Sequence, residues 1–174
     1  MGISVYRCNL LKTALAVVVL LFFLTGHVSA ITVEVTGNPQ DWVFTQGSNE
    51  NNLTVVHVSG TTDTWALNVR DALDYGKKSS SAGRLLEYNP TEGNWVNTGS
   101  ILSNNLTLVG PTATGQGLTG YSVALGPSDQ LLEKGAGDQT WNVTLNQAIT
   151  YNDPYLSNGH IYRVYLTLDV SEGT

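Results

Sequence analysis

The chain has 174 residues, of which 8 are basic and 14 are acidic, so its formal net charge is −6 with histidine neutral. An acidic chain is repelled by nucleic-acid phosphates and by anionic lipid headgroups, which argues against nucleic acid and membrane surfaces as partners. The single cysteine, Cys8, excludes both a disulfide within the chain and a metal site built from several thiolates.

Residues 1–30 have the pattern of a secretory signal peptide. Arg7 and Lys12 precede an uncharged apolar run over residues 14–24, and small residues end at Ala30. Because that run is shorter than the ~20 residues that span a bilayer, we expect cleavage after Ala30 rather than a membrane anchor. Removing the two basic residues leaves 6 basic and 14 acidic residues, a net charge of −8. We therefore expect a secreted, extracellular or cell-surface protein that does not insert into the membrane after cleavage.

Residues 31–174 are predicted to form a single domain made of short strands. Apolar and polar residues alternate in most of the segments, which places one face of each strand in a core. Turn residues such as Gly, Asn and Pro separate them. In chain order the expected strands are Ile31–Val35, Trp42–Phe44, Leu53–Val58, Trp65–Val69, Arg84–Tyr88, Asn94–Val96, Leu106–Leu108 and Tyr121–Leu125.

The clearest alternation lies in the closing segment, Asp138–Val170. An apolar series begins at Trp141, and a second series runs from Tyr162 at every other residue to the end of the segment. Asn152-Asp153-Pro154 interrupts them with residues that favour turns. We expect two antiparallel strands joined by a longer connection. The predicted fold class is an all-β antiparallel sandwich, either immunoglobulin-like or Greek-key.

Several segments resemble the WxL domain, an exported all-β domain of bacterial cell surfaces named for two Trp-x-Leu motifs. Trp65-Ala66-Leu67 looks like the first motif, and Leu102–Leu108 resembles the strand that follows it. Leu131–Trp141 is similar to the family's glycine-containing lead into a late strand, and Gly159–Tyr162 begins a similar closing segment. Where the family has its second motif, this chain has Leu168-Asp169-Val170. The resemblance implies attachment to the cell surface, and because the sequence shows no sorting motif or second apolar anchor, we expect that attachment to be non-covalent. Its motif residues are Trp65, Leu67, Trp141, Tyr162, Leu168 and Val170.

The four tryptophans divide into two pairs. Trp65 and Trp141 are in phase with apolar neighbours, which favours core positions because indoles bury a large area. Trp42 and Trp95 lie beside turn residues, where they could either stack on a sugar or pack over a sheet edge. Both interpretations of this second pair stay open at this point.

Metal binding and catalysis have little support in the sequence. Asp71 with Asp74, and Asp153 in its turn-rich loop, offer oxygen ligands that suit calcium, but solvated loop acids explain them more simply. Glu87 and Glu92 could mimic the two carboxylates of a glycosidase, although they flank a predicted hairpin. No known nucleophile, metal or phosphate motif is present. We predict no enzyme, no metal and no cofactor.

Three Asn-x-Thr sequons make Asn52, Asn105 and Asn142 possible N-glycosylation sites. The last two fall on the polar parity of their predicted strands, so glycans there would point to solvent.

Two functional hypotheses follow. The first is a non-catalytic, WxL-like surface protein bound to a cell-envelope polysaccharide or a neighbouring surface protein. The alternative is a structural subunit that self-associates into an extracellular filament or surface layer by strand addition at a sheet edge. This alternative requires a segment that lacks a partner in the monomer, and Ile31–Thr36 is the natural candidate.

Overall fold

The computed structural model describes residues 31–36, 42–60, 63–72, 81–111, 117–156 and 158–172, and it describes the side chains of all of these except 52–55. The predicted signal peptide therefore lies outside the described residues. The described part is built of strands without an α-helix, which confirms the all-β prediction. No helix long and apolar enough to cross a membrane occurs in it.

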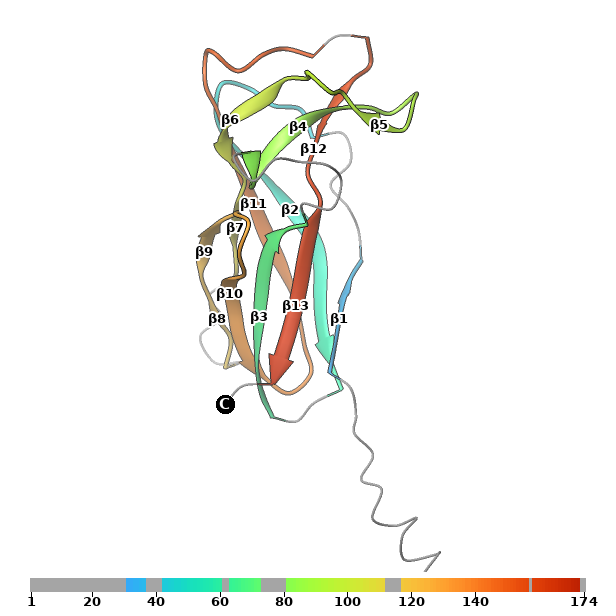
Figure 1. The fold of residues 1–174 in the computed structure, drawn as a ribbon. Coiled ribbons are helices and arrows are strands. Elements are labelled where there is room, and N and C mark those ends of the chain that lie inside the picture. The colour runs from blue at the N-terminus through green and yellow to red at the C-terminus, as the bar shows by residue number, and fades with distance from the viewer. Residues whose placement is uncertain are drawn as a thin grey trace, which may run out of the picture.

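Thirteen strands form in the described part of the chain (Figure 1). They are β1 (Thr32–Val35), β2 (Gly47–Ser59), β3 (Thr64–Asp71), β4 (Arg84–Asn89), β5 (Asn94–Trp95), β6 (Ile101–Asn105), β7 (Thr107–Val109), β8 (Thr119–Gly120), β9 (Ser122–Ala124), β10 (Gln130–Ala136), β11 (Gln139–Ile149), β12 (Ile161–Arg163) and β13 (Leu166–Glu172).

Two antiparallel sheets make up the larger part of the molecule, which we call the body. The five-stranded sheet has the order β1-β2-β11-β7-β9, and the four-stranded sheet has the order β13-β3-β10-β8. Apolar side chains from both sheets meet in one buried cluster. Strand β3 shows how this core arises, because its residues alternate strictly between buried and partly exposed along the whole strand. Its fully buried members include Trp65, Leu67 and Val69.

A third antiparallel sheet forms a separate part at one end of the body, which we call the head. Its order is β12-β4-β5, and β6 also pairs with β4, on the edge opposite β12. The described parts of the connection from β11 to β12, residues 150–156 and 158–160, lie over the head, as Figure 1 shows. The first residue of β1 and the last residue of β13 both lie at the opposite end of the body. The head is therefore remote from both ends of the described chain.

Two predicted strands differ from the structure. Trp42–Phe44 forms no strand, and the two rings instead pack on each other with centroids 4.8 Å apart against the core. The closing alternation from Tyr162 to Val170 is divided, because β12 belongs to the head and β13 to the body. Its inward parity is kept across the break, since Tyr162, Val164 and Leu166 all pack against the core. Strand β11 pairs with β2 and β7, so the two closing strands lie in different sheets.

The prediction that Ile31–Thr36 lacks a partner within the monomer is wrong. Strand β1 pairs antiparallel with β2, with Thr32 opposite Ser59 and Val35 opposite Val56. Ile31 and Val33 also pack against the core cluster. The alternation that made this segment a candidate for donation to another molecule serves its own sheet instead.

Candidate functional site

The first Trp-x-Leu motif lies in the core of the body. The Trp65 and Trp141 rings stack with centroids 5.2 Å apart and planes 8° from parallel. The Trp65 indole Nε1 donates a 2.8 Å hydrogen bond to the carbonyl of Gly137. Leu67 is fully buried on the same face of β3. These three predicted motif residues therefore lie together in the core, where they stabilise the fold.

The glycine between the two tryptophan segments makes this stack possible. Gly135 lies opposite Trp65 in the pairing of β10 with β3. A Cβ built on Gly135 would overlap the indole ring and lie 2.8 Å from its Cε2 and Cη2 atoms. The remaining motif residues, Tyr162, Leu168 and Val170, are partly buried against the core. None of the motif residues forms an exposed ligand platform.

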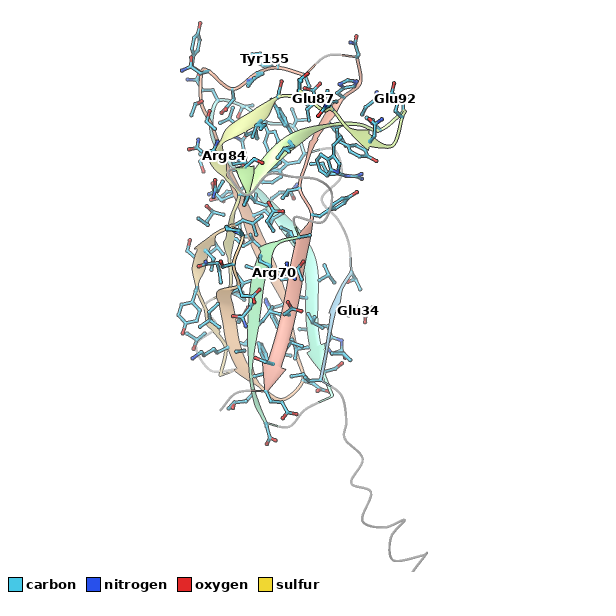
Figure 2. All side chains as sticks on the ribbon, in the orientation of Figure 1. Glu34, Arg70, Arg84, Glu87, Glu92 and Tyr155 are labelled. Atoms are coloured by element: carbon cyan, nitrogen blue, oxygen red, sulfur yellow. The ribbon has the colours of Figure 1, made fainter. Side chains whose placement is uncertain are left out.

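The head, by contrast, exposes aromatic side chains. Tyr151 is 85% exposed and Tyr155 is 99% exposed, and both lie on the connection between β11 and β12. We call them the head tyrosines, and Tyr155 is labelled in Figure 2. Sequence reasoning missed them, although two tyrosines that flank Asn152-Asp153-Pro154 are an available signal, because side chains beside such a turn tend to face solvent.

Asp153 fixes the loop that carries the head tyrosines. Its Oδ1 accepts hydrogen bonds of 2.7 Å from both the backbone nitrogen and the hydroxyl of Ser103 in β6. Its Oδ2 accepts from the backbone nitrogen of Thr150 at 2.6 Å and from its hydroxyl at 3.0 Å. Burial raises the pKa of the Asp153 carboxyl, but these hydrogen bonds outweigh it and hold the pKa below the usual 3.8. Asp153 is therefore an ionised anchor rather than a free loop acid.

Two further contacts hold the other end of this loop. The His160 Nδ1 lies 2.6 Å from the Glu87 Oε1 on β4, and the Tyr162 hydroxyl donates a 2.7 Å bond to the carbonyl of Pro154. The Glu87 Oε2 also accepts a 2.7 Å bond from the backbone nitrogen of Ser100. The bonds from Ser100 and from His160 lower the pKa of Glu87 below 4.5. The loop is thus tied to β6 and β4, while its two tyrosine side chains stay exposed to solvent.

Trp95 belongs to a second aromatic group in the head. Its ring contacts Tyr88 edge-on at 5.3 Å and Tyr165 at 5.5 Å between centroids. The Arg163 guanidinium lies 4.3 Å from the Tyr88 ring centroid and 5.5 Å from that of Tyr165, within the range of a cation–π interaction. Trp95 is partly exposed, so the interpretation that it stacks on a sugar stays open. The ring of Trp42, in contrast, packs on Phe44 and against the core.

The remaining acidic candidates do not gather into a reactive site. Glu87 is engaged with His160 and Ser100, while Glu92 is exposed and accepts a 3.2 Å bond from Asn94. The described residues contain no group of three or more histidine, cysteine, aspartate or glutamate side chains that could hold a metal ion. Asp71 is buried and accepts a 2.6 Å bond from the backbone nitrogen of Gly83, and Asp74 lies outside the described residues.

The three sequons differ in their surroundings. Asn142 is exposed on β11, and the side chain of Asn52 lies outside the described part. The Asn105 Nδ2, the atom to which a glycan would be attached, donates a 2.8 Å hydrogen bond to the carbonyl of Leu125. The expectation that Asn105 points to solvent therefore does not fit its position, because the amide is turned toward the junction between head and body.

Comparison of the chain with models of known protein families, with curated protein sequences and with solved structures gave no match. The likeness to WxL domains accordingly stays a prediction.

Proposed function

We propose that this protein is a non-catalytic, exported cell-surface protein that binds a cell-envelope polysaccharide or a neighbouring surface protein through its head. The observation that carries the proposal is the pair of head tyrosines, which are almost fully exposed on a loop that Asp153 anchors. Tyrosine offers a large amphipathic contact area at a low cost in conformational entropy. A fixed loop lowers that cost further, because less freedom is lost when a ligand binds.

The placement of the head supports this proposal. Both ends of the described chain lie at the far end of the body, so neither covers the head tyrosines (Figure 1). A protein retained at a surface through one end would present the other end outward. The aromatic group around Trp95 and Arg163 adds a second partly exposed surface on the same head.

The proposal includes three finer statements. Residues 1–30 are a cleaved signal peptide, as their charged start, apolar run and small residues at the end suggest. The two body sheets are the layers of a β-sandwich, which their common core supports. The protein is WxL-like and attached without a covalent bond, which rests on the Trp65-to-Leu67 motif and on the lead into β11.

Co-sedimentation tests the binding function. The chain from residue 31, which contains every described strand, is incubated with intact cell envelopes of the source organism and centrifuged. We expect the unaltered chain to sediment and the double variant Tyr151→Ala/Tyr155→Ala to lose at least tenfold in affinity. The matched control is Tyr121→Ala, because Tyr121 is 39% exposed but lies in the body beside β9.

Thermal unfolding of all three proteins shows whether a loss of binding reflects the surface or the fold. The double variant should unfold at the same temperature as the unaltered chain, since the two side chains make few contacts. Failure of the unaltered chain to sediment, or equal loss in the control and the double variant, would refute binding through the head.

The alternative is a structural subunit that assembles by strand addition. One observation favours it: among the described strands β13 has β3 as its one hydrogen-bonded partner, which makes β13 an edge strand of its sheet, although β1 lies near it. The pairing of β1 with β2 counts against β1 as the donated strand. Negative-stain microscopy at micromolar concentration separates the two functions. Ordered polymers would support the alternative, and uniformly single particles would exclude it.

A further inference from the structure

Glu133 on β10 is a buried carboxyl group without a partner in the described part of the chain. The residue is 0% exposed, and neither Oε1 nor Oε2 has a hydrogen-bond partner among the residues that the structure describes. Buried polar groups in proteins are nearly always hydrogen-bonded, and buried charges are nearly always paired. The two other buried acids of the described chain, Asp71 and Asp153, both accept hydrogen bonds. Glu133 is the exception, and its position requires an explanation.

A β-bulge turns Glu133 into the core. The register of β10 against β3 shifts between Leu131 and Glu133, and both Leu132 and Glu133 are buried. In a regular strand two neighbouring side chains point to opposite faces, whereas a bulge allows both to face inward. A glycine makes room for the carboxyl group, because a Cβ added to Gly110 would lie 3.2 Å from the Glu133 Oε2.

No described charge faces this carboxyl group. On β3, Arg70 pairs with Asp129 at the surface and Asp71 is held by Gly83. Lys134 follows on β10 but is exposed. Residues 106–111 and 117–125, which include β7, β8 and β9, contain no charged residue, and their one titratable side chain, Tyr121, is exposed. Burial alone raises the pKa of Glu133 from 4.5 to about 8.

We propose that Glu133 is a proton-controlled latch, which closes the core beneath β8 when protonated and loosens the edge formed by β8 and β10 when ionised. Strand β8 is only two residues long and pairs with Glu133 and Lys134 themselves. An ionised carboxylate needs water or a counter-charge, and displacement of this short edge strand is the smallest opening that admits water. The latch would make the body respond to the pH of the surroundings.

The direction of the effect follows from the two protonation equilibria. Below the ordinary pKa of 4.5 the carboxyl is protonated in the folded and the unfolded chain, and no difference arises. Between pH 4.5 and about 8 the unfolded chain loses its proton and the folded chain keeps it, so stability falls as the pH rises. This single group raises the opening constant by up to about tenfold for each pH unit in that range.

Carboxyl-carbon NMR of the chain from residue 31 tests the protonation itself. One glutamate resonance should titrate near pH 8, and it should be absent in Glu133→Gln. The matched control is Glu34→Gln, because Glu34 is exposed on β1 and should leave that resonance unchanged (Figure 2). If every glutamate of the unaltered chain titrates below pH 6, the latch is refuted without any variant.

Hydrogen exchange tests the opening. After correction for the intrinsic pH dependence, amides of β8 and β10 should lose protection at least tenfold between pH 6 and pH 9, and those of β11 less. The loss should disappear in Glu133→Gln and persist in Glu34→Gln. Equal loss of protection in the unaltered chain and in Glu133→Gln would show that another group controls the edge.

Discussion

The substitution Gly135→Ala tests whether the Trp65 and Trp141 stack holds the two body sheets together. An added methyl group would lie where the Trp65 indole now packs, with ring atoms Cε2 and Cη2 only 2.8 Å away. The ring is 1% exposed, so it cannot swing into solvent without leaving the core. We expect the indole to tilt away from Trp141, and this movement sets the energetic cost.

The cost can be assembled from two contributions. Forcing one extra methyl group into a packed core typically costs about 1–3 kcal/mol. Disturbing a parallel aromatic pair forfeits about 0.5–1.5 kcal/mol beyond the buried area. Gly135→Ala should therefore lower the free energy of unfolding by about 1.5–4.5 kcal/mol.

Denaturant unfolding followed by tryptophan fluorescence measures the loss, and near-UV circular dichroism reports the altered stack. Gly126→Ala is the matched control, since a Cβ there meets nothing within 4 Å and the change should fall within about 1 kcal/mol of neutral. In a Trp65→Phe background the smaller ring leaves room for the methyl group, so Gly135→Ala should cost much less there. An equal cost in both backgrounds would refute the steric reasoning.

Two further predictions concern the polar contacts of the head. Asp153→Ala removes the four hydrogen bonds that anchor the head tyrosines. It should increase hydrogen exchange across residues 150–156 and weaken envelope binding. Unchanged exchange in this loop would contradict the role of Asp153 as an anchor. Asn105→Ala removes the bond to the Leu125 carbonyl and should cost about 1–2 kcal/mol in denaturant unfolding, and an unchanged midpoint would show that water replaces the amide.

The sequence predicted the inward face of each strand better than the partners of the strand. Trp65, Leu67 and Trp141 were placed in the core by alternation alone, and the structure buries all three. Alternation is a local property, because it depends only on which way successive side chains point. Strand pairing depends on distant segments. The alternation of apolar residues over Tyr162–Val170 therefore did not reveal that this segment passes from the head sheet to a body sheet.

The candidate site was harder to predict for a related reason. A bulge shifts the parity by one residue, and the sequence around Glu133 gave no sign that this carboxyl faces inward. The exposure of Tyr151 and Tyr155 depends on Asp153, and the Asp153 partner Ser103 lies 50 positions away in the chain. Composition suggested a turn at Asp153, but it could not distinguish a solvated acid from a buried anchor.

The Asp153 and Glu133 carboxyl groups give the head and the body opposite responses to pH. Asp153 receives four hydrogen bonds, so its ionised form is favoured and its contribution to stability is lost as the pH falls below 3.8. Glu133 receives none from the described residues, so its neutral form is favoured and stability is lost as the pH rises above 4.5. Acid should therefore loosen the head first, and alkali the β8–β10 edge of the body. Both effects come from a carboxyl group, so the hydrogen bonds that each carboxyl group receives, rather than the residue type, decide whether the head or the body is destabilised at a given pH.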